Sequence, residues 1–499
     1  MKIVNSSQIK LLDKKTIEEF GIPSLVLMER AGLEVFKILQ KKYYFNKILI
    51  LCGTGNNGGD GLVLARLFHS INKKVTIVLI GDNNKRTQEN RHQLDLVKKL
   101  SINILDYTND LDFNNYDLII DSIFGVGLTR NLEGEYFEII NKANNSNSFK
   151  VAIDIPSGIN ADNGKILGIA FKANVTITFA LPKIAHYSDQ CLDYIGELHI
   201  VDIGIPEFYY ENINTNLVDE NFIKNIFNFE RKKNSHKGTF GRHLLIGGSI
   251  GLTGAINLAI KASLISGTGL VYGIVPNEIY NILASQIPSA MIYPINDKKI
   301  YEIIENSNCI SIGNGFGNNT ENIKLLEYLI ENYKNPLIID ADAINHISKN
   351  IETLKNRKYL TIITPHVGEL SRLINVSINE IQQDRIKAIS NFSNIFNNNF
   401  ILVLKGAKTI ISDSNNIYIN STGSPSLARG GSGDILSGII GSMICQNNNI
   451  LNSVILSVYI HGLVGEIISN KINDINIIPE NIIDYIPLAF NKIGKLSNI

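Results

Sequence analysis

Two glycine-rich segments that also carry acidic side chains are the parts of this 499-residue sequence that most clearly indicate chemistry. The first is GTGNNGGDG, residues 53–61, which follows an apolar run and precedes a helical pattern. Gly53, Gly55 and Gly58 have the GxGxxG spacing of a dinucleotide-binding turn. The asparagines and the aspartate of this loop suit sugar hydroxyls, an amide ring or a hard cation better than a pyrophosphate. A P-loop is excluded because no lysine stands at its required position.

Two further motifs place polar groups at the ends of apolar runs. DSIFGVGLTRN offers Asp121 and, after a glycine turn, Arg130, and DIPSG offers Asp154 and Ser157. Open α/β sheets bind ligands at the carboxyl ends of their strands, so we expect these groups at one rim with the first loop. Helix capping or a turn hydrogen bond is the alternative role for either aspartate. Together with Asn57 and Ser157, the two aspartates could also form an all-oxygen site for a hard cation.

The second glycine-rich segment, ARGGSGDILSG near the C-terminal end, is stronger evidence for a functional site than the first. Gly430, Gly431 and Gly433 would present backbone NH groups at the start of a helix, where the helix dipole favours an anion. Asp434 stands just inside that turn. Its carboxylate could take a proton from a hydroxyl group while the NH groups hold the charge of a transferring phosphate.

The lysines and histidines of the sequence give weaker evidence for a functional site than the two glycine-rich segments do. The segment LKGAKT, residues 404–409, follows an apolar run and predicts the edge of a nucleotide-binding site. A solvated charge at the end of a strand explains Lys405 equally well. His366 and Glu369 are three residues apart, which could pair them on one helical face. His461 lies in an apolar helical pattern and is assigned to packing.

A competing pattern is GxSxG in residues 247–251, with Asp340 and His366 following in the order of an α/β-hydrolase. It would make Ser249 the nucleophile of an esterase. We discount this interpretation because glycine, serine and threonine continue through Gly254, which suits an anion or a nucleotide better than a single strained serine.

The elements that would position these residues alternate between strand and helix. Helical patterns such as residues 61–71 and 88–100 separate short β-branched runs, which predicts an α/β sandwich with a mostly parallel sheet. The pattern stops over 205–235, so we expect a domain boundary near residue 220. The predicted strands are residues 47–53, 74–81, 117–125, 150–158 and 174–182, then 242–248, 269–276, 309–315, 336–343, 359–366 and 400–412, before helices at 430–442 and 453–466.

Composition narrows the class of protein. Lysine plus arginine and aspartate plus glutamate both number 47, so the formal net charge is 47 − 47 = 0, which argues against a dedicated nucleic-acid binder. The four cysteines are far apart without metal spacing, which predicts no disulfide framework and a reducing, cytoplasmic compartment. The first residues do not resemble a signal or transit peptide, and no run is expected to reach the roughly 18 apolar residues of a membrane span.

Taken in order, these motifs resemble the bifunctional NAD(P)H-hydrate repair enzyme family, in which an epimerase domain precedes a dehydratase domain. The resemblance covers nearly the whole chain. One departure is SIGNGFG, where the family usually has Gly-Pro-Gly and this chain has Asn314. The motifs are GIPSLVLMERAG (21–32), CGTGNNGGDG (52–61), DSIFGVGL (121–128), DIPSG (154–158), TFALPK (178–183), HKGTFGRHLLIGGSIGLTGA (236–255), DADAIN (340–345), TPHVGEL (364–370), LKGAKT (404–409) and GGSGDILSGII (430–440).

For residues 1–218 the resemblance implies a Rossmann-like three-layer sandwich. This domain would epimerise the R and S hydrates of NADH and NADPH, called NADHX and NADPHX, at C6 of the nicotinamide ring. The resemblance implies potassium bound by Asn57, Asp121 and Ser157, and Asp154 is the candidate for proton transfer. The residues that would hold the hydrate are Asn56, Asn57, Gly58, Gly59, Asp60, Gly125, Val126, Gly127, Leu128, Thr129, Arg130, Asn131 and Asp154.

For residues 225–499 the resemblance implies a ribokinase-like three-layer sandwich that dehydrates the S hydrate at the expense of a nucleotide. Asp434 would be the base in phosphorylation of the C6 hydroxyl. ADP is expected over ATP, with magnesium as the partner of the nucleotide. The hydrate would contact Ala255, Gly315, Gly317, His366 and Asp434, and the nucleotide would contact Lys405, Gly406, Ala407, Lys408, Thr409 and Gly433.

Three other functions stay open at this point. A nicotinamide-dependent dehydrogenase could use the loop at 53–58 with Asp82 as the ribose-binding acid, but the second half carries its own nucleotide signature. A sugar or vitamin kinase leaves the first 220 residues unexplained. A metabolite-binding scaffold would be expected to have lost Asp60, Asp154 and Asp434. A homo-oligomer is expected, without a residue pattern that specifies it.

Overall fold

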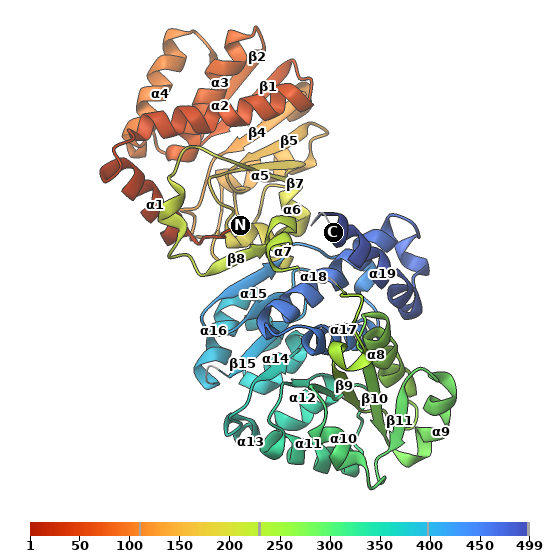
Figure 1. Cartoon of the computed structure of the whole chain (residues 1–499). Coiled ribbons are helices and arrows are strands. Elements are labelled where there is room, and N and C mark those ends of the chain that lie inside the picture. Colours follow the sequence, from red (N-terminus) through yellow and green to blue (C-terminus); the bar gives the residue numbers. More distant parts are fainter. Residues whose placement is uncertain (109–110, 228–230, 397–398, 497–499) are drawn as a thin grey trace. The chain divides into compact units, whose positions relative to one another are not determined.

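The computed structural model describes residues 1–108, 111–227, 231–396 and 399–496. The chain forms two compact units, one of residues 2–213 and one of residues 214–499 together with Met1 (Figure 1). Each unit is built around its own mostly parallel sheet.

The first unit holds a seven-stranded sheet with the order β3-β2-β1-β4-β5-β6-β7, in which every pair of neighbours is parallel. The order reverses beside β1, because β2 and β3 extend the sheet on one side of it and β4 to β7 on the other. The strands are β1 (Lys47–Cys52), β2 (Lys74–Leu79), β3 (Asn103–Asp106), β4 (Leu118–Ser122), β5 (Phe149–Ile153), β6 (Val175–Phe179) and β7 (Glu197–Val201).

Helices cover both faces of this sheet. Ile48 and Ile50 of β1 pack with residues of the first four helices, whereas Leu49 and Leu51 pack with residues of α5, as the alternation of side chains along a strand requires. The expected three-layer sandwich is therefore confirmed. The helices of this unit are α1 (Ser6–Glu18), α2 (Ser24–Lys42), α3 (Asn56–Ser70), α4 (Gln88–Lys99), α5 (Glu135–Asn145) and α6 (Leu192–Ile195).

The second unit holds a ten-stranded sheet with the order β11-β10-β9-β12-β13-β14-β15-β16-β17-β8. Its strands are parallel except at β16, which is antiparallel to both of its neighbours. The strands are β8 (Thr215–Val218), β9 (Arg242–Ile246), β10 (Leu270–Val275), β11 (Met291–Pro294), β12 (Cys309–Ile312), β13 (Leu337–Ile339), β14 (Thr361–Ile363), β15 (Phe400–Leu404), β16 (Ile410–Ser412) and β17 (Ile417–Asn420).

The order of this sheet reverses beside β9, so right-handed crossovers send its helices to opposite faces. Along the chain, α8 and α9 follow β9 and β10, whereas α11 to α16 follow β12 to β14. Helix α8 packs with α17 and α19 (Figure 1). The helices are α7 (Glu220–Ile226), α8 (Thr253–Ile265), α9 (Asn277–Gln286), α10 (Ile300–Glu305), α11 (Thr320–Asn332), α12 (Ala341–Ile347), α13 (Ile351–Lys355), α14 (Val367–Ile374), α15 (Ile378–Gln383), α16 (Arg385–Ile395), α17 (Ser432–Gln446), α18 (Ile450–Ser469) and α19 (Pro479–Leu496).

The structure divides the chain a few residues earlier than the sequence predicted. Residues 214–218 were assigned to the first domain, but β8 pairs in parallel with β17 and belongs to the second sheet. The run that forms β8 is short and lies in a polar stretch, so its sequence carries no strand pattern. Met1 joins the second unit because its carbonyl oxygen accepts a hydrogen bond from the Leu217 NH.

Two other expectations concern the environment of the chain. All four cysteines are free, as expected. The sequence predicted no run long enough for a membrane span, but α18 is long and apolar enough by length and composition. Because 67% of its apolar window is buried inside the second unit, packing in the core accounts for its composition.

Candidate active sites

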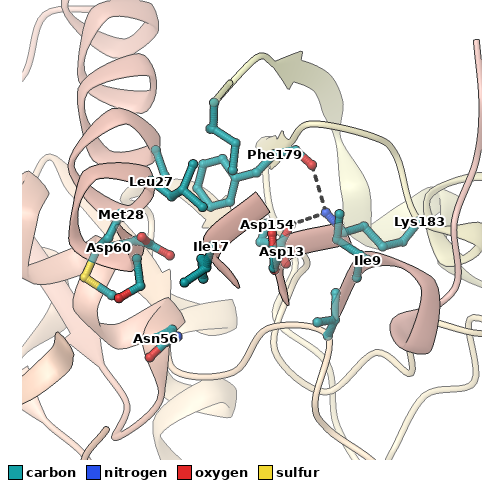
Figure 2. A pocket seen from close by; sticks show the side chains of 14 residues that line it. Ile9, Asp13, Ile17, Leu27, Met28, Asn56, Asp60, Asp154, Phe179 and Lys183 are labelled. Atoms are coloured by element: carbon teal, nitrogen blue, oxygen red, sulfur yellow. Dashed lines mark hydrogen bonds and ion pairs between the residues drawn. The ribbon is translucent and has the colours of Figure 1, made fainter. Parts of the chain in front are cut away.

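The pocket of the first unit lies at the carboxyl ends of the strands and encloses about 660 Å³, counting the part open to solvent (Figure 2). Helices α1, α2 and α3 and the segments after β4, β5 and β6 contribute to its wall. Ligands bind at such places in open α/β sheets, where the strand order reverses. The lining residues are Ile9, Asp13, Ile17, Ser24, Leu27, Met28, Ala31, Asn56, Asp60, Val126, Asp154, Phe179, Lys183 and Ile203.

The Asp154 carboxylate is paired with a buried lysine. Lys183 Nζ lies 2.5 Å from Asp154 Oδ1, and its side chain is 1% exposed. Figure 2 shows the ammonium group reaching both this carboxyl group and the Phe179 carbonyl oxygen, which is 3.2 Å away. Burial by itself would raise the pKa of Asp154, but the charge and hydrogen bond of Lys183 hold it below its usual value. Asp154 is therefore ionised at neutral pH.

The backbone around Asp154 is held in an unusual conformation. Asp154 has φ +66°, a region that side chains other than glycine rarely adopt, and such strain clusters at functional sites. His186 stabilises the turn, because its Nδ1 accepts from the Lys183 NH at 3.0 Å and its Nε2 lies 2.9 Å from the Asp154 carbonyl oxygen. Burial lowers the pKa of His186 to about 3, so the ring is neutral and Nε2 donates to that oxygen.

Two more carboxyl groups face the same pocket without a protein partner. Neither Asp13 nor Asp60 forms a hydrogen bond or ion pair within the described residues, and Asp60 is 8% exposed. Burial raises the pKa of Asp60 well above its usual value, and the charges of Asp154 and Asp13 act in the same direction. Burial raises the pKa of Asp13 to about 6, against the opposing effect of Lys183.

The glycines of the first loop allow close packing. A Cβ atom on Gly58 would lie 2.1 Å from the Gly53 carbonyl oxygen, and one on Gly59 would lie 2.5 Å from Met28 Cε. Both glycines are buried, and neither lines the pocket. They let the first turn of α3 approach the loop after β1 and helix α2, which leaves Asn56 and Asp60 at the wall of the pocket.

The structure brings together the three residues predicted to hold a cation. Ser157 Oγ donates to Asp121 Oδ1 at 2.6 Å and accepts from the Phe124 NH at 2.9 Å, while Asn57 Nδ2 donates to the Phe124 carbonyl oxygen at 2.9 Å. Asp121 is fully buried, and burial raises its pKa to about 6 against its hydrogen bonds from Ser157. The described residues contain no cluster of three or more His, Cys, Asp or Glu suited to a metal, so any cation here would rely on neutral oxygens around one carboxylate.

The remaining residues predicted to hold the hydrate lie in the segment after β4. Val126 lines the pocket, and a Cβ atom on Gly125 would lie 3.5 Å from Asp154 Oδ2. Leu128 is buried in the core on the α5 side of the sheet. The others are exposed, namely Gly127, Thr129, Arg130 and Asn131.

In the second unit, Asp434 stands in the first turn of α17 as predicted. Asn314, in the loop after β12, donates from Nδ2 to Asp434 Oδ1 at 2.8 Å and to Asp340 Oδ2 at 3.3 Å. Burial raises the pKa of Asp434 to about 6, the hydrogen bond from Asn314 lowers it, and the charge of Asp340 raises it. Asn314 is fully buried, and its Oδ1 has no hydrogen-bond partner in the part of the chain that the structure describes.

Lys405 turns towards the acids of this site. Its Nζ lies 2.9 Å from Asp340 Oδ1 and 3.8 Å from Glu369 Oε2, and these carboxylates raise the pKa of Lys405 although burial alone would lower it. Burial raises the pKa of Glu369 to about 7. A Cβ atom on Gly433 would lie 3.4 Å from Lys405 Nζ, so the two predicted nucleotide contacts are adjacent. The charge of Lys405 is thus partly buried and paired, where the sequence had left a solvated charge equally possible.

The rest of the predicted nucleotide rim follows β15. Gly406 and Ala407 are exposed, and Thr409 Oγ donates to the Gly406 carbonyl oxygen at 3.2 Å. The Lys408 ammonium group donates to the Ser421 carbonyl oxygen.

Three of the predicted hydrate contacts of this unit are the small residues Ala255, Gly315 and Gly317. Ser249 Oγ donates to the Gly315 carbonyl oxygen at 3.0 Å, and a Cβ atom on Gly315 would lie 3.1 Å from Ala255 Cβ. The Gly317 NH donates to Asp342 Oδ2 at 3.0 Å. The hydroxyl group of Ser249 therefore has a structural partner, which removes support for the esterase interpretation.

His366 is the N-cap of α14. Its Nδ1 accepts from the Gly368 NH at 2.9 Å, and Glu369 Oε2 accepts from the His366 NH at 2.8 Å. The three-residue spacing therefore pairs His366 with Glu369 as a capping box, and the histidine side chain is 55% exposed. His461 lies 3.1 Å from Ser432 Oγ, between α18 and the first turn of α17, where the sequence assigned it to packing.

Sequence reasoning missed several residues of both sites. Lys183 belongs to a quoted motif, but only the structure pairs it with Asp154. The sequence contains only weak evidence for Asp13. It lies on one face of α1 with Ile9, four residues before it, and Ile17, four residues after it. In the second unit, the bond from Asn314 to Asp434 spans 120 residues of sequence.

Comparisons with known proteins agree with this arrangement. Residues 243–488 match the NAD(P)H-hydrate dehydratase family, and residues 24–185 match the family described as the YjeF-related protein N-terminus. The bifunctional NAD(P)H-hydrate repair enzyme Nnr of Dictyoglomus turgidum is 34% identical over 520 residues, covering 100% of both chains. The Nnr of Escherichia coli is 30% identical, covering 93% of this chain and 89% of the relative.

The chain belongs to the bifunctional NAD(P)H-hydrate repair enzyme family. Two solved structures resemble its second unit. A ribokinase-like superfamily protein from Enterococcus faecalis has a TM-score of 0.52 and 26% identity, covering 57% of this chain and 98% of that protein. An ADP/ATP-dependent NAD(P)H-hydrate dehydratase from Bacillus subtilis, co-crystallised with ATP and Mg²⁺, has a TM-score of 0.50 and 26% identity, covering 56% of this chain and 99% of that protein.

The buried pair of the first unit makes a prediction about stability. Replacing Lys183 by methionine leaves the buried Asp154 carboxylate unpaired, so we expect the first unit to lose about 3–5 kcal/mol of stability. Urea unfolding followed by circular dichroism measures the loss. Lys42→Met is the matched control, because Lys42 and Glu197 are 43% and 53% exposed and such a pair contributes about 0–1 kcal/mol. Equal losses in the two variants would contradict the assignment.

Proposed function

We propose that this chain interconverts the R and S hydrates of NADH and NADPH in its first unit and dehydrates the S hydrate in its second. The observation that carries the proposal is that two separate sites occur in one chain. Each has buried carboxyl groups at the reversal point of its own sheet, in the domain order of full-length relatives.

Asp434 supports the chemistry proposed for the second unit. As a base it would take the proton of the C6 hydroxyl group, while the hydroxyl oxygen attacks the terminal phosphorus of the nucleotide. The bond from that phosphorus to its bridging oxygen breaks, so AMP leaves when ADP is the donor and ADP leaves when ATP is the donor. The ring nitrogen lone pair then expels phosphate, and loss of a proton from C5 gives NAD(P)H. The hydrogen bond from Asn314 keeps Asp434 oriented and favours its ionised form.

The charged groups beside Asp434 fit a nucleotide and its magnesium ion. The glycines before Asp434 offer backbone NH groups at the start of α17, and Lys405 lies beside Gly433. Magnesium usually binds one or two carboxylates together with substrate phosphates, and Asp340 and Glu369 are the carboxylates nearest Lys405. Magnesium would neutralise phosphate charge there. ADP is the expected phosphate donor, with ATP as the alternative.

In the first unit, the donors around Phe124 fit potassium. Asn57 Oδ1 has no hydrogen-bond partner among the described residues, and the Asp121 carboxylate, Ser157 hydroxyl and Phe124 carbonyl oxygens lie close by. Neutral oxygens of this kind replace the hydration shell of potassium. Potassium would stabilise the ionised form of the buried Asp121, and Asp154 would be the group that moves the proton in epimerisation.

Other parts of the proposal concern the setting of the enzyme. Four free cysteines are compatible with a reducing compartment, and we propose the cytoplasm. NADHX and NADPHX are the proposed substrates, together with ADP or ATP. A homo-oligomer stays a prediction.

The direct test mixes the purified chain with R and S hydrates of NADH, magnesium and ADP or ATP, and follows the absorbance of reformed NADH. We expect complete conversion of both hydrates. Asp434→Asn should lower the dehydration rate by about 10²–10⁴-fold, because it removes the base, while R/S interconversion followed by chromatography continues. No NADH with either nucleotide would exclude the dehydratase function, and conversion that stops after the S fraction would exclude the epimerase function.

The pKa of Asp434 makes a prediction about pH. Because Asp434 must be ionised to act as a base, kcat/KM of dehydration should fall as the pH drops through about 6. Asn314→Ala removes a hydrogen bond that lowers this pKa, so the fall should begin at higher pH. Asn332→Ala, at an exposed position on α11, is the control and should keep the wild-type profile. Identical profiles for N314A and wild type would contradict the role of Asn314.

The cation set makes a prediction about salt. Replacing potassium by tetramethylammonium, which cannot enter the site, should slow R/S interconversion severalfold. Ser157→Ala should need more potassium for half-maximal interconversion, because one oxygen ligand is lost. Its dehydration of the S hydrate should equal that of the wild type at every salt concentration. Interconversion by the wild type at one rate in both salts would rule out the potassium site.

A further inference from the structure

We propose that Asp13 of α1 is a second proton-transfer residue of the epimerase site, acting as the acid while Asp154 acts as the base. The inference rests on the proposed epimerase function of the first unit. It concerns a residue that lies before the matched residues 24–185.

Interconversion of the R and S hydrates requires two proton-transfer groups, an acid and a base. C6 of the hydrate is bonded to a hydroxyl oxygen and to ring nitrogen N1, so its configuration inverts only if one of these bonds breaks and forms again. In the proposed step the C6–N1 electron pair goes to N1, which takes a proton from Asp13. The O–H electron pair forms the C6=O bond as Asp154 takes the hydroxyl proton. Rotation about C5–C6 and reversal of both transfers close the ring on the other face.

Asp154 has one oxygen available for its part. Oδ1 accepts hydrogen bonds from Lys183 and from Thr178 Oγ at 3.0 Å, so it is occupied. Oδ2 has no hydrogen-bond partner among the described residues, and it lies near Gly125, the neighbour of the pocket-lining Val126. The ion pair with Lys183 keeps this carboxyl group ionised and ready to accept a proton.

Lys183 is not suited to be the acid, although it is the only cation among the described residues that line the pocket. An ammonium group has three protons, and Lys183 Nζ donates to Asp154 Oδ1, to Thr178 Oγ at 2.8 Å and to the Phe179 carbonyl oxygen. All three donors are therefore in use inside the protein, which makes Lys183 a positioning residue for Asp154.

Asp13 and Asp60 remain as candidates for the acid, and the geometry favours Asp13. Both line the pocket with unpartnered carboxyl groups, but the Asp60 side chain is the more deeply buried. Asp13 stands between Ile9 and Ile17, which line the same pocket. Burial raises the pKa of Asp13 to about 6, and a general acid works best with a pKa near the working pH.

The two carboxyl groups thus differ as an acid–base pair must. Asp154 is held ionised by a lysine, whereas Asp13, in the same pocket, is pushed towards its protonated form. Divergent environments for neighbouring titratable groups are what assign acid and base roles in enzymes.

The test uses the full chain, because the second unit supplies an internal reference. Asp13→Asn should lower kcat of R-to-S interconversion by about 10²–10⁴-fold with little change in KM, because the proton donor is lost while the wall keeps its shape. Dehydration of the pure S hydrate should be unchanged. Glu18→Gln is the matched control, since Glu18 lies on the same helix with a 62% exposed side chain, and it should interconvert the hydrates at the wild-type rate.

Asp13→Glu distinguishes loss of the proton donor from loss of activity caused by unfolding of the first unit. It keeps a carboxyl group on α1, so it should retain more interconversion than D13N, with equal circular dichroism and urea unfolding in the two variants. Interconversion by D13N within about threefold of the wild type, or a change confined to KM, would overturn the role of Asp13. A wild-type chain that does not interconvert the hydrates would instead overturn the proposed epimerase function.

Discussion

The reversal of strand order in each sheet is the constraint on which both sites depend. Where β1 and β4 lie side by side, the connections that follow them turn to opposite faces of the first sheet, and the same happens at β9 and β12 in the second. Two loops diverge there and leave the carboxyl ends of the strands accessible. In the first unit these loops lead into Asn56, the first residue of α3, and include Val126. In the second unit they include Ser249 and Asn314.

The two sites handle buried charge in a similar way. Each has a single lysine among several carboxyl groups, Lys183 in the first unit and Lys405 in the second. A buried carboxylate without compensation shifts towards its neutral form. In the first unit, Lys183 keeps Asp154 ionised. In the second, Lys405 pairs with Asp340, and the amide of Asn314 donates a hydrogen bond to Asp434.

Two activities in one chain are chemically complementary. The dehydration proposed for the second unit uses one stereoisomer, so a chain with that activity alone would leave the other hydrate unrepaired. The proton transfers proposed for the first unit need no nucleotide, because every bond that breaks is formed again. The two proposed steps therefore call for different groups: an acid–base pair around the pocket of the first unit, and a base in the first turn of α17 in the second.

The sequence by itself determined the local parts of this protein. Apolar runs that end in glycine or aspartate identified most of the strands, because a strand covered on both faces must be apolar throughout. Motif order identified the family, and the clustering of Asn57, Asp121 and Ser157 followed from their positions at strand ends. Only the tertiary structure decided that β8 belongs to the second sheet, that Lys183 pairs with Asp154 and that Asp13 faces the same pocket. Such contacts join segments up to about 200 residues apart, and they depend on burial and on the direction of side chains, which periodicity along one segment does not record.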